Sequence, residues 1–155
     1  MPAMMKIYEL LSREAIEVDL SAGDKDGLLR ELSRKAARSL QIPEKDVLKA
    51  ILSREELGST GTGGGIALPH ARMAAVPRPF AVFARLRRPI DFEAVDGAPV
   101  DLVCLVLLPP AKGDQINALA CVARGLRDPG RLKLIREAPD AATIYAALIQ
   151  DSPAA

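Results

Sequence analysis

The stretch VDLVCLVLL, residues 100–108, decides the fold class of this sequence, and Pro109 and Pro110 close it. Almost every position in it is apolar, which is typical of a strand that is covered on both faces within an α/β sheet. The run is far shorter than the roughly 20 apolar residues that a membrane-spanning helix needs. It therefore predicts a buried central strand, and no insertion into a membrane is expected.

Helical and extended patterns alternate on both sides of this strand. The interleaving predicts an α/β fold, a single domain in which a mixed β-sheet is sandwiched between helices. We place that domain at residues 6–150 and expect a loose C-terminal tail at residues 151–155. The individual predictions are strands at 16–20, 66–68, 80–86 and 100–108, a turn at Asp96-Gly97, and helices at 6–11, from an Asp24 N-cap to Leu40, from Pro43 to near Gly58, from an Asp114 cap to about Leu126, and from an Asp140 cap to Ile149.

Composition excludes several classes of function. The chain has 155 residues, and its 21 Lys and Arg against 20 Asp and Glu leave a net charge of +1, whereas nucleic-acid binders need an excess of cations. No nucleic-acid partner is expected. Cys104 and Cys121 have no metal-ligand spacing and only one histidine is present, so we expect buried thiols, no metal and no cofactor. Reduced thiols, and charged residues that interrupt any secretory signal near the N-terminus, favour the cytoplasm.

A glycine-rich segment, GSTGTGGG at residues 58–65, is predicted to be a loop. Backbone without Cβ atoms can approach an anion closely and direct N–H groups at it, so such loops often bind phosphate. The segment lacks the Gly-Lys-Ser/Thr ending of a P-loop, and Ile66 stands where a dinucleotide fingerprint starting at Gly61 needs its third glycine. A tight structural connection is the alternative interpretation.

The only histidine, His70, closely follows this loop, in the run IALPH at residues 66–70. A neutral imidazole is a good nucleophile near pH 7, and attack on phosphorus would form a phosphohistidine of high transfer potential. Hydroxyls of Ser59, Thr60 and Thr62 are available to hold the phosphoryl oxygens. The alternative is a hydrogen-bonded loop histidine without a chemical role.

Arg54 lies in the last turns of the second predicted helix and can fold back over the loop. A guanidinium pairs bidentately with phosphate oxygens, and each such charge-assisted bond contributes about 1.5–3 kcal/mol. The alternatives are a solvated cation at a helix end or an ion-pair partner for Glu55 or Glu56.

Together these residues resemble a known family. The run REELGSTGTG at residues 54–63, followed by GIALPH at residues 65–70, is similar to the active-site region of the IIA domains of the fructose, mannitol and nitrogen-regulatory type in the bacterial phosphotransferase system. The resemblance extends over nearly the whole chain and is strongest to the stand-alone nitrogen-regulatory type.

The resemblance implies an α/β sandwich around a mixed sheet and a phosphotransferase chemistry with a phosphohistidine intermediate. It implies that His70 accepts the phosphoryl group from an HPr-like phosphocarrier protein and that Arg54 neutralises its charge. Partners that distinguish the two phosphorylation states, such as kinases or potassium-transport components, are implied as regulatory targets. The phosphate-binding residues are then expected to be Ser59, Thr60, Gly61, Thr62 and Gln115.

The chain departs from the family pattern at three places. Gly64 stands where the family commonly has Asn, and Ala71-Arg72 replaces the common Gly-Lys after the active histidine. Gln115 stands where many members have a second histidine. Because Gln115 can donate a hydrogen bond but carries no charge, acceptance at His70 is expected to survive this change, while onward transfer is in question.

Two other functions fit the sequence. The chain can be a sugar-specific IIA component that passes phosphate to a separate permease, or a binding module that no longer transfers phosphate. A local excess of arginine, with five of them and no carboxylate between residues 72 and 88, could steer an acidic partner or merely solvate a strand edge.

Overall fold

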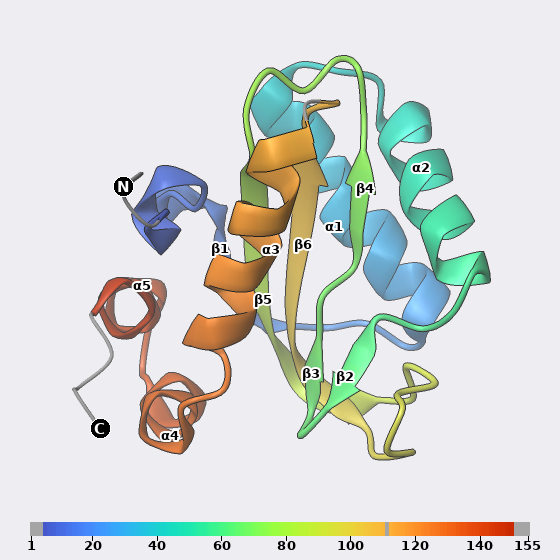
Figure 1. Cartoon of the computed structure of the whole chain (residues 1–155). Coiled ribbons are helices and arrows are strands. Elements are labelled where there is room, and N and C mark those ends of the chain that lie inside the picture. The colour runs from blue at the N-terminus through green and yellow to red at the C-terminus, as the bar shows by residue number, and fades with distance from the viewer. Residues whose placement is uncertain (1–4, 111, 151–155) are drawn as a thin grey trace.

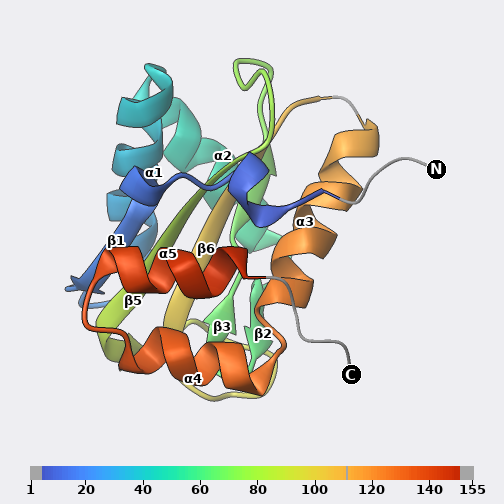
Figure 2. The ribbon, with the colours of Figure 1, turned by 90° about the vertical axis from the view of Figure 1, so that its left-hand side faces the viewer.

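The computed structural model describes residues 5–110 and 112–150, with side chains left undescribed over residues 112–116. A mixed β-sheet lies between two layers of helices (Figure 1, Figure 2). One layer contains α1 and α2, and the other contains α3, α4 and α5. The elements are two short 3-10 turns at Ile7–Glu9 and Arg13–Ala15, strands β1 (Ile16–Leu20), β2 (Gly61–Gly63), β3 (Ile66–Ala67), β4 (His70–Arg72), β5 (Phe80–Ile90) and β6 (Val100–Leu108), and helices α1 (Lys25–Leu40), α2 (Glu44–Glu56), α3 (Lys112–Gly125), α4 (Pro129–Glu137) and α5 (Ala141–Ile149).

The sheet has the strand order β1-β5-β6-β3-β2, and β4 also pairs with β6. β5 runs antiparallel to β6, whereas β3 and β4 run parallel to β6 and β1 runs parallel to β5. This arrangement confirms the predicted mixed sheet between helices.

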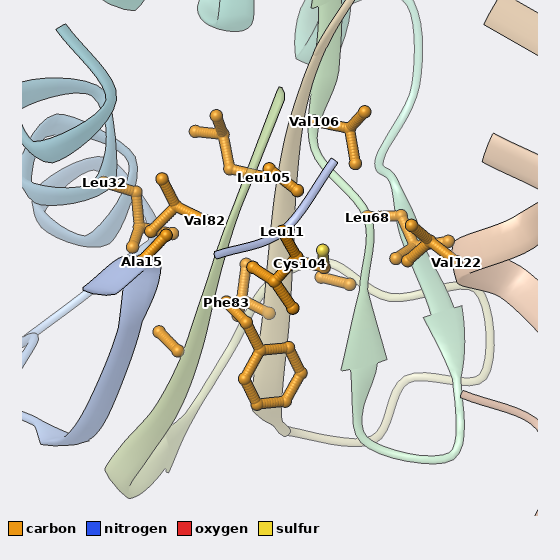
Figure 3. Close-up of a cluster of buried hydrophobic side chains, with 14 of the residues drawn as sticks. Leu11, Ala15, Leu32, Leu68, Val82, Phe83, Cys104, Leu105, Val106 and Val122 are labelled. Atoms are coloured by element: carbon orange, nitrogen blue, oxygen red, sulfur yellow. The ribbon is translucent and has the colours of Figure 1, made fainter. Parts of the chain in front are cut away.

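Strand β6 forms the centre of the hydrophobic core, as its sequence predicts. Every residue of β6 except Asp101 is buried. Figure 3 shows part of the core, in which Val82 and Leu105 of the sheet lie in one cluster with Leu32 of α1 and Val122 of α3. Apolar side chains on both faces of β6 therefore join the two helical layers, and their burial supplies most of the driving force for folding.

Two helix starts follow their sequence signals, and two differ from prediction. The Asp24 carboxylate caps α1 by accepting from the Gly27 N–H at 2.7 Å, and Asp140 caps α5 in the same way. The predicted Asp114 cap is wrong, because α3 begins at Lys112 and places Asp114 inside the first turn. Helix α4 is absent from the prediction, although it has an Asp128 N-cap and a proline at its first position.

The glycine-rich segment is only partly a loop. Gly61–Gly63 forms β2, which turns back as a hairpin onto β3. This differs from the predicted loop because backbone pairing with β3, and not side-chain pattern, holds these glycines extended. The tip of the hairpin at Gly64 and Gly65 has positive φ angles of 68° and 83°, which glycine adopts without strain.

Strands β3 and β4 are two parts of one strand that lies along β6, and because β2 pairs with β3, only the β4 part is at the edge of the sheet. Ile66 pairs with Leu102 and His70 with Val106, so the register against β6 is the same before and after the break at Leu68-Pro69. Pro69 lacks an N–H, which an edge strand tolerates, and its carbonyl accepts from the Val106 N–H at 2.8 Å. This pairing fixes where His70 lies along the sheet.

Candidate active site

A groove of about 610 Å³ lies at the sheet edge, where both helical layers approach β4. The last turns of α2, strand β4, the end of β6 and Leu119 of α3 form its walls. His70 and Arg54 both line it, although 16 positions separate them in the sequence. The groove therefore brings together the two residues that the sequence predicts to be catalytic.

The imidazole of His70 is held in one orientation by a backbone contact. Its Nδ1 lies 2.7 Å from the carbonyl oxygen of Leu68, and because a carbonyl only accepts, Nδ1 must carry the proton. The second ring nitrogen, Nε2, then keeps its lone pair. Burial is the main cause that lowers the pKa of His70, and the charge of Arg54 lowers it further, while the Leu68 contact and Glu55 act in the opposite direction. A lowered pKa keeps the ring neutral and nucleophilic near pH 7.

Arg54 is held against the loop that follows α2. Its Nη1 donates to the carbonyl oxygen of Gly58 at 3.0 Å. Among the side chains that the structure describes, those of residues 5–110 and 117–150, no carboxylate forms an ion pair with it, so the alternative pairing with Glu55 or Glu56 is not observed. The guanidinium thus stays in the groove with its charge unpaired by acidic side chains of this described part.

Ser59 and Thr60 stabilise the turn between α2 and β2. Ser59 Oγ donates to the Phe92 carbonyl at 2.7 Å and accepts from the Gly61 N–H at 3.1 Å. Thr60 is buried, and both its hydroxyl and its N–H donate to the carboxylate of Glu55. The hydroxyls of both residues are therefore engaged by the protein itself.

Three other predicted phosphate-binding residues are not brought to His70 by the described contacts. Gly61 and Thr62 lie in β2, where Gly61 pairs with Ala67 and Thr62 Oγ1 lies 3.5 Å from the Ile66 carbonyl. At about 3.3 Å per strand residue, these two contact positions, Ala67 and Ile66, lie roughly 10–13 Å along the strand from His70. Gln115 belongs to α3, and its side chain lies outside the described residues.

The arginines between residues 72 and 88 do not form one basic rim. Arg72 lines the groove beside His70. Arg85 instead binds Asp19 and the carbonyl oxygens of Ile135 and Ala138, which is a structural role. Arg87 and Arg88 lie near the Ile90 end of β5. The opposite end of β5, at Phe80, is the one that pairs with the part of β6 next to β4.

Sequence reasoning missed two residues beside the site, Glu55 and Lys25. The side chain of Glu55 is only 5% exposed, and its Oε1 lies 3.0 Å from Lys25 Nζ. Glu55 could have been found, because it stands inside the motif between Arg54 and the loop. Lys25 carries no local signal, because only the packing of α1 against α2 brings it close.

Comparisons with known proteins give one matching family model and several similar proteins. The family model described as phosphoenolpyruvate-dependent sugar phosphotransferase system, EIIA 2, matches residues 9–151. A nitrogen regulatory protein of Bradyrhizobium diazoefficiens is 45% identical over 145 residues, covering 93% of this chain and 95% of that protein. One from Pseudomonas aeruginosa is 34% identical over 146 residues, covering 92% of this chain and 94% of that protein.

A solved structure has the same fold. The crystal structure of nitrogen regulatory protein IIA-Ntr from Neisseria meningitidis superposes with a TM-score of 0.86 at 32% identity, covering 92% of this chain and 98% of that one. No helix in the described part of the chain is long and apolar enough to cross a membrane. Fold, groove and sequence similarity lead to one conclusion: the chain belongs to the EIIA 2 family of the phosphoenolpyruvate-dependent sugar phosphotransferase system.

Proposed function

We propose that this protein is a cytoplasmic regulator of a nitrogen-type phosphotransferase system, which accepts a phosphoryl group from an HPr-like phosphocarrier onto Nε2 of His70. The observation that carries the proposal is the Nδ1 contact with the Leu68 carbonyl. It places the proton on the far side of the ring from the nucleophilic nitrogen and holds the ring in the groove that Arg54 also lines.

The transfer is a single displacement at phosphorus. The Nε2 lone pair of His70 forms the new N–P bond as the N–P bond to the carrier's imidazole breaks, and the electron pair of the broken bond returns to that imidazole. The Nδ1 proton stays on His70, where the Leu68 carbonyl stabilises the positive charge that develops on the ring. Arg54 offsets the charge of the phosphoryl oxygens, which is the main catalytic requirement of phosphoryl transfer.

The loop supports this chemistry mainly by its position. We assign Ser59 and Thr60 to holding the turn beside the groove, because their hydroxyls already bind Phe92 and Glu55. Gly61 and Thr62 support the hairpin behind the turn. Gln115 is proposed as a neutral hydrogen-bond donor to the phosphoryl group.

The regulatory role rests on the similarity to nitrogen regulatory proteins over almost the full length of the chain. In this role the free and phosphorylated forms are distinguished by target proteins, for which kinases or potassium-transport components are candidates. Transfer onward to a sugar is separable from this role by adding permease membranes and asking whether label reaches sugar.

The test is phosphorylation by the carrier with its upstream kinase and phosphoenolpyruvate. Mass spectrometry should show one acid-labile phosphoryl group on the protein. His70→Ala should remove it, while Arg78→Gln, which changes an exposed cation outside the groove lining, should keep it. Label retained on His70→Ala protein would overturn the assignment.

A further inference from the structure

Glu55 has a nearly buried carboxylate next to the groove and no part in the transfer described above. It lies between Arg54, which lines the groove, and Glu56, which is exposed. Its side chain is 5% exposed, and its oxygens bind Lys25 Nζ at 3.0 Å, the Thr60 N–H at 3.2 Å and the Thr60 hydroxyl. Burying a charge is costly unless it is paired and hydrogen-bonded, and here every described contact satisfies that need.

A continuous series of contacts leads from this carboxylate to the histidine. Glu55 accepts from Thr60, the Thr60 carbonyl accepts from the Leu68 N–H at 3.0 Å, and the Leu68 carbonyl accepts from His70 Nδ1 at 2.7 Å. Only the Thr60 and Leu68 backbones lie between the carboxylate and the imidazole. Each hydrogen bond in this series fixes the position of the backbone that makes the next one.

A second side chain of α2, that of Arg54, also binds this turn. Arg54 donates to the Gly58 carbonyl at 3.0 Å, while Glu55 holds Thr60 two residues later. Two consecutive residues of α2 thus bind the turn at both of its ends. The turn holds Leu68 through the hydrogen bond from the Leu68 N–H to the Thr60 carbonyl. The placement of the guanidinium and of the imidazole therefore depends on one short segment.

We propose that Glu55 is a positioning residue for phosphoryl transfer, acting on His70 through Thr60 and Leu68, and that Lys25 neutralises it so that a phosphoryl dianion can be held nearby. This inference rests on the proposed function for its effect on transfer. Lys25 is suited to the role because its side chain is 15% exposed, packs over the Phe92 ring at 4.6 Å and reaches Glu55 from α1. An unpaired Glu55 carboxylate would instead repel the incoming phosphoryl group.

Glu55→Gln tests the proposal, with Glu56→Gln as the matched control one position away. The first measurement is an NMR titration of the His70 ring in unphosphorylated protein, which needs no donor. Glu55→Gln should lower the pKa of His70 relative to the unmodified protein, because the Glu55 charge opposes the lowering. Hydrogen exchange of the Leu68 amide should become faster, because its acceptor Thr60 is less firmly held. Glu56→Gln should change neither quantity.

The second measurement is the single-turnover rate of phosphorylation by the carrier. Loss of positioning should slow Glu55→Gln by about 10-fold to 100-fold and leave Glu56→Gln at the unmodified rate. If Glu55→Gln fails to fold in a thermal melt, Thr60→Val replaces it, which removes the hydroxyl contact and keeps the carboxylate. Thr60→Val should likewise slow transfer and speed Leu68 exchange.

A folded Glu55→Gln protein with an unchanged His70 pKa, unchanged Leu68 exchange and an unchanged rate would overturn the proposal. The failure of the proposed function is a different result, in which the unmodified protein itself accepts no phosphoryl group. The titration and the exchange measurement would then still decide whether Glu55 positions His70.

Discussion

His70 Nδ1 and the carbonyl oxygen of Leu68 lie 2.7 Å apart, where Leu68-Pro69 interrupts the strand between β3 and β4. A side chain thus bonds to the backbone of its own edge strand, two residues earlier. The contact selects the tautomer of the ring without using a second side chain. It accounts for how a protein with one histidine can present a defined nucleophilic nitrogen.

The first prediction concerns pH. Burial lowers the pKa of His70 below its ordinary 6.5, and only the neutral ring can attack phosphorus. The rate of phosphorylation should therefore rise with pH through the lowered pKa and stay level across neutral pH. The NMR titration of the ring and the pH profile of the single-turnover rate should give the same midpoint. A midpoint above 6.5 would contradict the burial argument.

The same shift affects stability. Between the unfolded pKa near 6.5 and the lower folded pKa, the unfolded chain binds a proton that the folded protein does not. The free energy of unfolding should therefore decrease as pH falls through this window, and His70→Gln should reduce that decrease. Urea unfolding at a series of pH values measures the free energy of unfolding of the unmodified protein and of the His70→Gln protein.

The second prediction concerns Arg54. Arg54→Lys keeps the positive charge but loses the planar pair of donors, whereas Arg54→Gln loses the charge. We expect transfer to slow by about 10-fold in the first and by about 10²–10³-fold in the second, by analogy with removal of a single oxyanion donor. The measurement is the rate at which each variant takes up labelled phosphoryl group from the carrier. Equal rates in both variants and the unmodified protein would remove Arg54 from the mechanism.

The third prediction contrasts the two glycines at the hairpin tip. A Cβ on Gly65 would lie 2.7 Å from Arg136 Nη2 and 2.8 Å from Asp101 Oδ1, with φ at +83°, so Gly65→Ala should destabilise the protein by about 1–3 kcal/mol. Gly64 has φ at +68° and no atom within 4 Å of such a Cβ. Because asparagine tolerates this conformation, Gly64→Asn should stay within about 0.5 kcal/mol. Denaturant unfolding of the two variants provides the comparison.

The fourth prediction concerns the core. Leu105 of β6 is fully buried between the two helical layers. Leu105→Ala should lower the free energy of unfolding by about 2–5 kcal/mol, because it removes buried methyl groups and leaves a cavity. Leu134→Ala, at an exposed position of α4, is the control and should change it little.

The fifth prediction concerns the thiols. Burial raises the pKa of Cys104 to about 12, so almost no thiolate exists at neutral pH. Iodoacetamide should leave Cys104 unmodified in the folded protein and modify it once the chain is unfolded in guanidinium chloride. Mass spectrometry of the peptides decides, and rapid native labelling of Cys104 would show that β6 opens far more often than its burial indicates.

An element can be predicted from the sequence when its signal lies within the element itself. Strand β6 and helix α1 were predictable, because their apolar pattern and the Asp24 cap lie within the elements themselves. Strands β2 and β4 have three residues each, which is too short for a periodic pattern. Backbone pairing forms them, β2 in a hairpin with β3 and β4 against the distant β6. Helix α4 is absent from the prediction because Pro129-Gly130 is typical of a turn, and only the Asp128 cap before it indicates a helix.

The candidate site shows the same division. His70 and Arg54 stood out because each belongs to a short motif, and the groove brings them together. The ion pair between Lys25 and Glu55 joins two helices across 30 positions, and only tertiary packing creates it. Gly61 and Thr62 lie in strand β2 because of the hairpin with β3. A glycine-rich sequence does not predict such a hairpin.

The unbroken register of residues 66–72 against β6 sets a limit on insertions and deletions. Adding one residue between Ala67 and His70 would turn the imidazole to the other side of the sheet, because side chains alternate along a strand. Lengthening the connection at 73–79, which follows the histidine, would leave its position unchanged. Among relatives of this chain, length variation should therefore be absent from the first segment and permitted in the second.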